Sequence, residues 1–462
     1  MTAIQTDFDP ALVRRLDRAG PRYTSYPTAD RFGEAFGETS YRVAAARRNT
    51  GGVQRPLGLY VHLPFCRDVC FYCACNKIIT RDASKSARYL HYLGREIELQ
   101  AALFQPDTRV SHMHWGGGTP TYYDVAQLAS LFGRIGRHFD LAEDGQYSIE
   151  IDPRTLEEGT LQALRDLGFN RASLGVQDFD PDVQVAIHRI QSEELVSRAV
   201  EEARRTGFRS VNLDLIYGLP RQTLETFDST LAKVTRIRPD RIALYNYAHM
   251  PALFKPQRRI AENELPAPPE KLKLLELAIE RLSSAGYVYI GMDHFALPED
   301  ELAVAQRQGR LNRNFQGYST CADSDLIGLG VSAIGAIGAT YSQNHRNLDA
   351  YYERLDRQQL PVLRGIELTA DDLVRRTVIH RLMCNFSVSL EAIEAAYLID
   401  FGRYFARELD ELRTFESEQM LTLDEGWISV TPRGRFVIRS VCMVFDRHLK
   451  DGRAIGRYSK VI

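Results

Sequence analysis

Residues 57–75 read LGLYVHLPFCRDVCFYCAC. The first seven, Leu57–Leu63, form a short apolar run that is typical of a buried strand. The loop that follows directly carries the cysteines Cys66, Cys70, Cys73 and Cys75. Strand and loop together indicate a site that is built where a buried strand ends.

The alternation of a short apolar run with a longer amphipathic stretch repeats along the next 230 or so residues. Such an alternation predicts parallel strands joined by right-handed helical crossovers, and six or seven units favour a partial (β/α)6-type TIM-like barrel. In a barrel, the functional loops follow the carboxyl ends of the strands. Strands are predicted at 57–63, 110–115, 146–151, 171–176, 210–216, 241–247 and 287–291, and helices at 86–104, 125–138, 155–167, 193–206, 223–234 and 270–285.

The segments on either side of the barrel core, which we place at 56–300, differ from it in composition. Residues 1–55 are predicted to be an extension, because GPRYTSYP at 20–27 prevents regular structure and suits a linker or a strap over a site. The alternation decays after Gly291, so 301–365 is predicted to be a loop-rich extension of the core. Residues 366–462 form a mostly helical C-terminal domain, in which strands at 421–423 and 427–430 and a helix from Pro432 give a winged-helix pattern.

The composition is that of an ordinary globular protein, with 462 residues of which 44% are hydrophobic and 26% charged. Basic residues number 58 and acidic residues 60, so a general nucleic-acid-binding surface is not expected. No apolar run reaches the ~18 residues of a membrane helix, and the nearest, 326–339, is rich in glycine and suits a buried strand and turn. The first residues show no secretory signal, so we expect a cytoplasmic location.

The spacing C-x3-C-x2-C of Cys66, Cys70 and Cys73 supplies three thiolates from one loop. Three ligands leave one iron of a four-iron cubane free for a small ligand, whereas ferredoxin-type spacing would fill all four corners. A structural zinc site with Cys75 as fourth ligand is the alternative, disfavoured because such sites usually use two separated ligand pairs. Unligated surface thiols would be prone to oxidation. Cys75 either faces a substrate or is a small residue in a tight turn.

This cysteine motif after the first strand of a partial barrel resembles the radical S-adenosylmethionine (SAM) superfamily. The resemblance implies that Cys66, Cys70 and Cys73 hold a 4Fe-4S cluster. The amino and carboxylate groups of SAM would then chelate the fourth iron. Reductive cleavage of SAM at the cluster would release a 5'-deoxyadenosyl radical, while the protein supplies binding and orientation.

The next two strand ends carry groups that suit the SAM amino group. Consecutive glycines at 116–118 let the backbone approach a ligand closely, although a purely structural turn would use them too. Glu150 is costly in an apolar strand unless it is paired, so it is either a ligand contact or half of an internal salt bridge.

The later strand ends complete the pattern. Gln177 offers donors and acceptors for ribose hydroxyls, and Arg189 could neutralise the SAM carboxylate or form a surface salt bridge. Asp214 is a candidate for ribose binding, and Ala248 leaves room for an adenine. Because these residues occur at successive strand ends, the sequence predicts a cofactor pocket.

Over nearly its whole length the chain resembles the oxygen-independent coproporphyrinogen III oxidase family, in segments that include 20–28, 60–80, 114–122 and 214–223. The resemblance implies oxidative decarboxylation of two propionates of coproporphyrinogen III to vinyl groups, which gives protoporphyrinogen IX in haem biosynthesis. It also implies SAM contacts at Tyr60, Gly117, Glu150, Gln177, Arg189, Asp214, Ala248 and Ile334, and a second SAM near Tyr72, Gly118 and Thr119.

A substrate with four propionates needs cationic partners. Arg22 in the 20–27 segment is the main candidate, and we place it with Cys75 on the substrate side of the site. Lys77 and Arg313 are weaker candidates, with solvated surface charge as the alternative. Residues 431–462 hold eight basic and two acidic residues, a net +6, which suits a cover over an anionic substrate better than DNA binding.

The same resemblance implies an electron donor of flavodoxin or ferredoxin type and an electron acceptor. We expect a monomer with no nucleic-acid partner and no membrane span. A non-enzymatic haem carrier of the same superfamily is the alternative, and a branch that transfers methyl groups and degrades haem is a third. Cys75 and the GPRYTSYP segment, which the carrier branch tends to lack, favour the enzyme.

Overall fold

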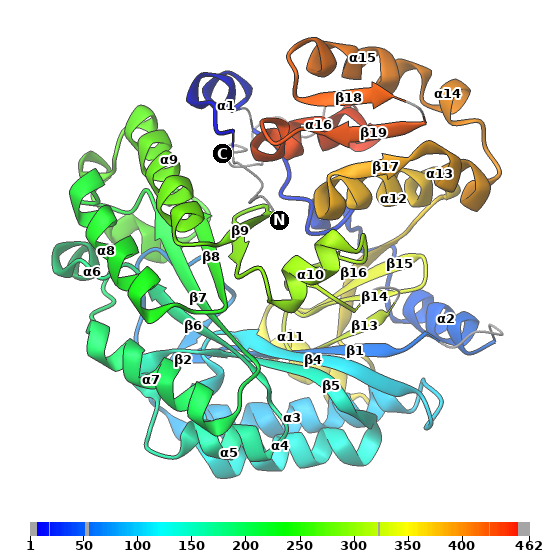
Figure 1. Ribbon diagram of the computed structural model, residues 1–462. Coiled ribbons are helices and arrows are strands. Elements are labelled where there is room, and N and C mark those ends of the chain that lie inside the picture. The colour runs from blue at the N-terminus through cyan, green and yellow to red at the C-terminus, as the bar shows by residue number, and fades with distance from the viewer. Residues whose placement is uncertain (1–6, 18, 51–54, 322–323, 425, 451–462) are drawn as a thin grey trace.

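The structure is a computed structural model and describes residues 7–17, 19–50, 55–321, 324–424 and 426–450. A curved sheet with helices along its outer side forms the larger part of the chain (Figure 1). Six successive strands of this sheet run parallel, which confirms the predicted partial barrel. They are β1 (Leu57–Leu63), β4 (Arg109–Gly117), β5 (Asp140–Ile151), β6 (Arg171–Gln177), β7 (Ser210–Tyr217) and β8 (Arg241–Asn246).

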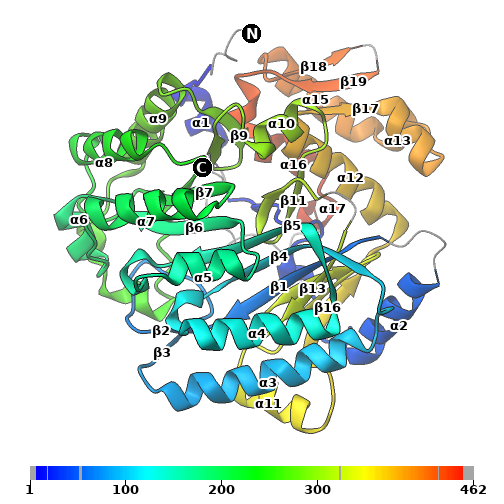
Figure 2. The ribbon, with the colours of Figure 1, turned by 60° about the horizontal axis from the view of Figure 1, so that its bottom comes forward.

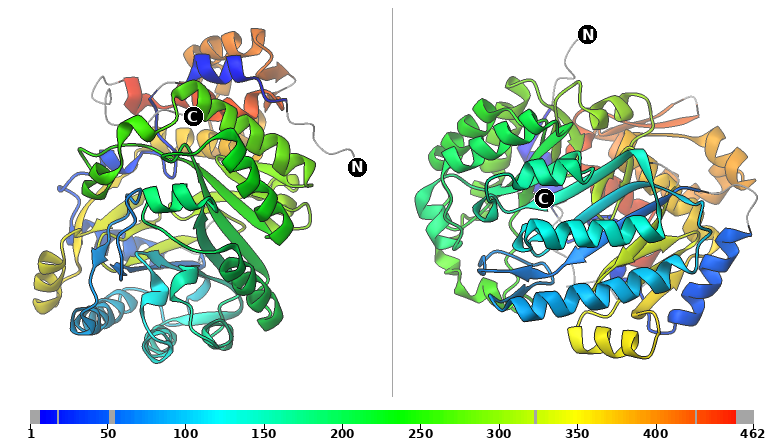
Figure 3. Two further views of the ribbon diagram at one scale, coloured as in Figure 1. Left: turned by 90° about the vertical axis from the view of Figure 1, so that its left-hand side faces the viewer. Right: turned by 90° about the horizontal axis from the view of Figure 1, so that it is seen from below.

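The helices between these strands, and α9 after the last of them, pack on the outside of the sheet (Figures 2 and 3). Their starts follow local capping chemistry, such as the box in which Asp124 and Gln127 cap each other's backbone amides. The helix predicted from residue 155 begins later because Pro153–Thr155 forms a 3-10 turn and Gly159 has φ +80°. The helices are α3 (Ala83–Ala101), α4 (Val125–His138), α5 (Thr160–Asp166), α6 (Pro181–Ala186), α7 (Glu193–Thr206), α8 (Leu224–Ile237) and α9 (Pro268–Ser284).

Side chains alternate between the two faces of the barrel strands. The outward residues, such as Leu59 and Trp115, are fully buried against the helices. The inward residues are polar, and they contact one another across neighbouring strands. They include Tyr60, His62, His114, Ser148, Glu150, Ser173, Asn212 and Asp214. Branched aliphatic residues usually fill a barrel interior, so this polar lining indicates a ligand-binding interior.

The sheet continues beyond both ends of the parallel set, in order β16-β15-β14-β13-β1 at one end and β8-β10-β9 at the other. The strand predicted at 287–291 is β9, which pairs antiparallel with β10 at the edge of the sheet and not with β8, so it does not add a seventh unit to the parallel set. These outer strands are β9 (Val288–Gly291), β10 (His294–Ala296), β13 (Asp325–Leu329), β14 (Ile334–Ile337), β15 (Thr340–Asn344) and β16 (Val362–Glu367).

The region 301–365, predicted to be loop-rich, contains several short strands of this sheet. β13 runs parallel to β1, and β14 folds back on β13, which confirms the strand and turn expected at 326–339. A Cβ on Gly328 would lie 2.7 Å from the backbone of Ile334, so this glycine permits close strand packing rather than a loop. Further elements here are α10 (Glu301–Arg307), β11 (Asn312–Asn314), β12 (Gly317–Ser319) and α11 (Leu348–Asp356).

The C-terminal part has its own apolar core and a three-stranded sheet in order β17-β19-β18, which confirms the winged-helix pattern. Helix α12 contacts β9, α10 and β11 of the barrel part. The helix expected from Pro432 starts as a 3-10 turn at Gly434–Val437. The elements are α12 (Ala370–Asn385), β17 (Ser387–Ser389), α13 (Leu390–Tyr397), α14 (Phe401–Tyr404), α15 (Ala406–Ser417), β18 (Leu421–Asp424), β19 (Trp427–Val430), α16 (Ile438–Val444) and α17 (Arg447–Lys450).

The N-terminal segment, with α1 (Pro10–Leu16) and α2 (Glu38–Asn49), includes an irregular stretch at 20–28 that we call the strap. Tyr23 and Tyr26 of the strap are buried in the C-terminal core. The residues Arg453, Arg457 and Lys460 of the basic tail lie outside the described residues. None of the helices that the structure describes is long and apolar enough to cross a membrane.

Candidate functional site

The cysteine loop is held at both ends by short strands. β2 (Phe65–Cys66) pairs in parallel with β3 (Ile78–Ile79), so the chain leaves and returns at one place. The loop after β4 is tied to it, because the amides of Gly118 and Thr119 donate to the carbonyls of Leu63 and Phe65 at 2.9 and 3.0 Å. The cysteine and glycine loops therefore form one unit at the carboxyl ends of β1 and β4.

The three motif thiols lie in surroundings rich in hydrogen-bond donors. Cys66 and Cys70 are buried and Cys73 is partly buried. Thr119 Oγ1 lies 3.3 Å from the sulfur of Cys66, and Arg189 Nη1 lies 3.6 Å from that of Cys70. These donors favour thiolates, the form that binds iron.

The pKa values of two of the thiols shift in opposite directions. A hydrogen bond from the Cys75 thiol, with help from Lys77, lowers the pKa of Cys73 to about 6 despite its burial. Burial raises the pKa of Cys66 to about 11, although the Thr119 hydroxyl opposes the shift. Cys75 itself is exposed, and donating to Cys73 raises its pKa.

Two kinds of metal site could use the thiols of this loop, a single ion or a cluster. Among the residues that the structure describes, no three His, Cys, Asp or Glu side chains are grouped so that they could hold a single metal ion. A cubane cluster is larger and takes one thiolate at each of its separate corners. Three thiols on one loop, with donors near the sulfurs of Cys66 and Cys70, could each bind one corner of such a cluster.

The glycines of the second strand end make room for a carboxylate and for the loop. A Cβ on Gly116 would lie 2.7 Å from the Glu150 carboxylate, and one on Gly118 would lie 2.6 Å from the Pro64 backbone. Gly117 has φ +115°, and its amide donates to Glu150 Oε2 at 3.0 Å. The predicted Gly-rich turn therefore has no room for a residue larger than glycine.

Glu150 is ionised at neutral pH. Burial opposes its ionisation, but His114 at 3.3 Å and the Gly117 amide hold the pKa of its carboxyl below the ordinary value. Of the two sequence interpretations, an internal pair exists with His114, and the carboxylate also borders the barrel interior. Glu150 can therefore pair with His114 and contact a ligand at the same time.

Tyr60 and His62 link the inner face of β1 to the end of the cysteine loop. His62 Nε2 lies 2.9 Å from the Asn76 carbonyl, so it carries the proton. His62 Nδ1 then accepts from the Tyr60 hydroxyl at 3.0 Å. The Tyr60 ring also stacks on His114 with an interplanar angle of 12°. These contacts fix the position of Tyr60 beside Glu150.

Arg189 is buried rather than part of a surface salt bridge. Its Nη1 lies 3.2 Å from Asp152 Oδ2, and Arg154 Nη2 donates to the same oxygen at 2.7 Å. Burial opposes ionisation of Asp152, but the two guanidinium groups hold its pKa below the ordinary value. Arg154 also approaches the Cys70 sulfur, at 3.7 Å. Two cations share one carboxylate, which leaves excess positive charge facing Cys70.

Asp214 lies in the same interior, one strand beyond Ser173. Its carboxyl accepts from Asn212 Nδ2 at 2.8 Å and from Ser173 Oγ at 3.1 Å. Burial and the nearby Glu150 charge raise the pKa of Asp214 to about 7. Gln177 ends β6 with a left-handed φ of +71° and is buried at the same rim.

Ala248 and Tyr72 are joined by a buried amide, that of Gln257. Gln257 Nε2 donates to the Tyr72 carbonyl at 2.9 Å and to the Ala248 carbonyl at 3.2 Å, while its Oε1 accepts from the Met250 amide. This side chain fastens the cysteine loop to the segment after β8.

Arg22 and Ile334 lie at the edges of the group. Arg22 Nη2 lies 3.4 Å from the Asn246 carbonyl at the end of β8, and its Nη1 is 3.9 Å from Asp293. Ile334 packs against Gly328, which pairs with Tyr60. Cys321 lies away from the cysteine loop, and its carbonyl accepts from Asn312.

Sequence reasoning missed several residues of this group. Ser148 could have been found, because it lies two residues before the predicted Glu150 on the same strand face, and His114 because it lies two residues before the glycine turn that starts at 116. His62 has the same signal relative to Tyr60. Arg154 and Gln257 carry no periodic signal, and Asp152 lies two residues after Glu150 but beyond the end of β5, so these three are recognised only from the folded contacts. The residues that the sequence did not single out are His62, His114, Ser148, Asp152, Arg154, Ser173, Asn212 and Gln257.

Comparisons with known proteins agree with this arrangement. The radical SAM superfamily matches residues 60–234 and the HemN C-terminal domain matches residues 368–437. An oxygen-independent coproporphyrinogen III oxidase of Pseudomonas aeruginosa is 49% identical over 98% of this chain and 99% of its own length. That of Escherichia coli is 47% identical over the full length of both chains. The solved E. coli structure, described as a radical SAM enzyme, superposes with a TM-score of 0.92 at 48% identity, over 96% of this chain and 100% of that one.

Proposed function

The chain belongs to the radical SAM family of oxygen-independent coproporphyrinogen III oxidases, and we propose that Cys66, Cys70 and Cys73 bind its 4Fe-4S cluster. It is an oxidoreductase that converts two propionate side chains of coproporphyrinogen III into vinyl groups and gives protoporphyrinogen IX. The observation that supports the ligand assignment is the set of donors around these thiols. Thr119 lies beside Cys66, Arg189 and Arg154 beside Cys70, and Cys75 beside Cys73.

When bound, the cluster and SAM supply the radical that removes a hydrogen atom from the propionate β-carbon, after which carbon dioxide and one electron are lost. The chain's residues bind and orient. Glu150 presents an ionised carboxylate for the SAM amino group, and Arg189 presents a cation for the SAM carboxylate. The Gly117 amide, which donates to Glu150, holds that carboxylate in place.

The remaining cofactor contacts are proposed from the same rim. Gln177 and Asp214 offer hydrogen bonds to ribose hydroxyls, and Ala248 leaves space for the adenine ring. Tyr60, held by His62, and Ile334 border the same interior. Tyr72, Gly118 and Thr119 are the positions proposed for a second SAM.

Arg22 and Cys75 are proposed to act on the substrate side. The Arg22 guanidinium lies at the end of β8, with a long contact of 3.9 Å to Asp293, so it can pair with a propionate. The exposed thiol of Cys75 lies next to the cluster ligand Cys73 and can reach a bound substrate.

The wider setting completes the proposal. The strap within 1–55 and the C-terminal domain at 366–462 would cover the core at 56–300 and its extension at 301–365. The electron donor is proposed to be of flavodoxin or ferredoxin type, with a separate electron acceptor and a monomeric enzyme. A cytoplasmic location suits four reduced thiols on one loop. No observation favours a non-enzymatic haem carrier.

Anaerobic reconstitution tests the proposal. Iron and sulfide analysis should give a four-iron cluster, and reduced enzyme with coproporphyrinogen III should yield methionine, 5'-deoxyadenosine and carbon dioxide. A product of porphyrinogen plus one methyl group would instead support the methyl-transferring branch. SAM cleavage with no carbon dioxide, together with tight haem binding, would overturn the assignment.

A further inference from the structure

A cavity of about 550 Å³ lies between the strap, the segments 309–320 and 324–326, and helix α12. Its volume falls within the range of small-molecule sites, about 300–1,000 Å³. The lining includes the strap residues Tyr23–Tyr26 and the β14 residue Ala336. The cavity thus joins three parts of the chain that are far apart in sequence, and none of its lining residues belongs to the cysteine loop.

The lining is strongly cationic. Five arginines border the cavity, namely Arg55, Arg310, Arg313, Arg376 and Arg381. Its one carboxylate, Asp325, is already paired with Arg48 at 2.7 Å. In the parts of the chain that the structure describes, none of the five arginines forms an ion pair with a carboxylate, whereas 23 other arginines do.

Arg313 shows that this is more than a solvated surface. Its Nε and Nη1 atoms are buried and have no hydrogen-bond partner among the described residues. Its guanidinium lies 4.6 Å from the centre of the Tyr318 ring. Burying guanidinium N–H groups without an acceptor costs free energy, so the chain retains them here at the expense of stability. A bound carboxylate would supply the missing acceptors.

The cavity reaches the barrel interior. Thr320, which lines it, accepts a hydrogen bond from Gln146 Nε2 at 2.5 Å. Gln146 lies on the inner face of β5, in line with Ser148 and Glu150. On the other side, the ring of Tyr318 packs edge-on to His294, and His294 packs edge-on to Tyr245 of β8. A ligand in the cavity would therefore lie beside the chamber that holds the proposed SAM contacts.

We propose that this cavity binds the propionate carboxylates of coproporphyrinogen III that are not reacting, with Arg313, Arg376 and Arg381 as their partners. The inference rests on the proposed function and deepens it by naming the groups that recognise the substrate. Four carboxylates on one ring system need several cations at once, and the cavity offers five uncompensated ones. Arg22, at the end of β8, is left to face the propionate that reacts.

The test uses reconstituted enzyme and the stable porphyrins coproporphyrin III, with four carboxylates, and mesoporphyrin IX, with two. Binding is followed anaerobically by quenching of porphyrin fluorescence. The wild-type chain should bind the four-carboxylate probe at least tenfold more tightly. The double variant Arg376→Gln with Arg381→Gln, and separately Arg313→Gln, should lose at least tenfold affinity for coproporphyrin III and much less for mesoporphyrin IX.

A matched control is Arg403→Gln with Arg413→Gln, two exposed arginines of the same C-terminal domain, and it should bind both probes as the wild type does. Equal affinity of cavity variants and wild type for coproporphyrin III would overturn the inference, even if the wild type decarboxylates its substrate. A wild type that binds but releases no carbon dioxide would instead count against the proposed function. Unchanged iron content and thermal midpoint show that the variants are folded and loaded.

Discussion

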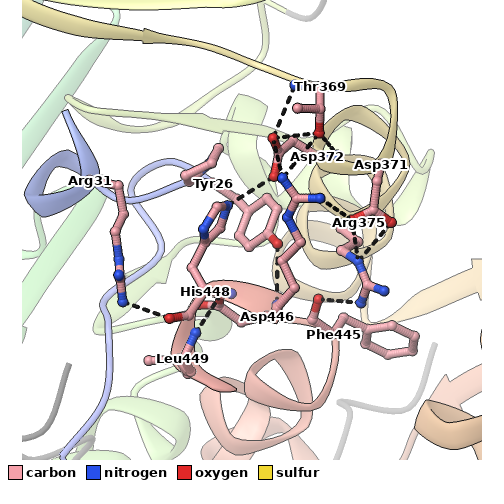
Figure 4. A network of polar contacts seen from close by, with 12 residues as sticks. Tyr26, Arg31, Thr369, Asp371, Asp372, Arg375, Phe445, Asp446, His448 and Leu449 are labelled. Atoms are coloured by element: carbon pink, nitrogen blue, oxygen red, sulfur yellow. Dashed lines mark hydrogen bonds and ion pairs between the residues drawn. The ribbon is translucent and has the colours of Figure 1, made fainter. Parts of the chain in front are cut away.

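Two arginine-rich regions contact the strap, and they differ in how their charge is balanced. The first, which we call the latch, consists of Asp371, Asp372, Arg375 and His448, which Figure 4 labels, together with Arg447. Arg447 bridges Asp371 at 2.7 Å and Asp372 at 3.0 Å, while His448 meets Asp372 at 2.9 Å. The second region is the cationic cavity, whose five arginines have no carboxylate partner in the described chain.

This difference in charge balance indicates that the latch arginines stabilise the fold, whereas the cavity arginines bind a ligand. In the latch every charge has a partner within the protein, and the same network holds the strap, because the Arg447 amide donates to the Tyr26 hydroxyl. Arg31, three residues after the strap, also donates to the His448 carbonyl (Figure 4). In the cavity the partners must come from a ligand. The carboxyl end of the barrel around Asp152, which we call the barrel mouth, is intermediate, because Arg154 and Arg189 share Asp152 and direct their remaining charge at Cys70.

The largest expected effect is at the barrel mouth. Cys70→Ser removes the thiolate that balances the excess charge of Arg154 and Arg189, so the cluster absorbance and all SAM cleavage should be lost. Ultraviolet–visible spectra and 5'-deoxyadenosine release measure this. Cys321→Ser, which lies away from the loop, is the control and should keep both signals. A wild-type cluster spectrum in the Cys70→Ser variant would show that the Cys70 thiolate neither binds the cluster nor balances the charge of Arg154 and Arg189.

Arg22 offers a sharper test, because its ion pair with Asp293 is long, at 3.9 Å. If Arg22 binds a substrate carboxylate, Arg22→Ala should lower the rate of decarboxylation about 100-fold. That is the loss expected for a charge-assisted contact of roughly 3 kcal/mol. SAM cleavage without substrate should persist, and Arg22→Lys should recover part of the turnover. Wild-type turnover by the Arg22→Ala variant would show that Arg22, like the latch arginines, does not bind the substrate.

The latch predicts a change in stability rather than in activity. Asp372 has a side chain only 2% exposed, and Asp372→Ala leaves Arg447 and His448 without it. Losing a buried partner costs several kcal/mol, but Arg447 is a third exposed, so we expect about 2 kcal/mol. The thermal midpoint should fall by a few degrees. The cavity variants should show no such fall in thermal midpoint. An equal fall in the cavity variants and in Asp372→Ala would contradict the proposed difference between the two regions.

The smallest expected effect is on pH dependence. Although burial opposes it, hydrogen bonds from His448 and Thr369 and the charge of Arg447 lower the pKa of Asp372 to about 2. A lowered pKa contributes stability that is complete above the unfolded value, near 3.9, and is lost as pH falls toward 2. The stability gap between wild type and Asp372→Asn should be constant above about pH 5 and shrink below pH 4. A gap that persists unchanged to pH 2 would contradict this role for the latch.

The sequence alone determined the six parallel strands, the winged-helix pattern and the three cysteines, because each of these features depends on the spacing of residues that are close together in the sequence. Strand faces repeat every two residues, helix faces every three to four, and the cysteine motif lies within one loop. The family resemblance then pointed to the residues at the strand ends.

Only the tertiary structure decided how distant segments meet. It placed β13 beside β1, brought Gln257 between Tyr72 and Ala248, and gathered Arg55, Arg313 and Arg376 around one cavity. These contacts join residues that are tens to hundreds of positions apart, so no periodicity along the chain records them. Whether an arginine is paired or free depends on which carboxylate the fold brings within reach, and that is a property of the packed chain.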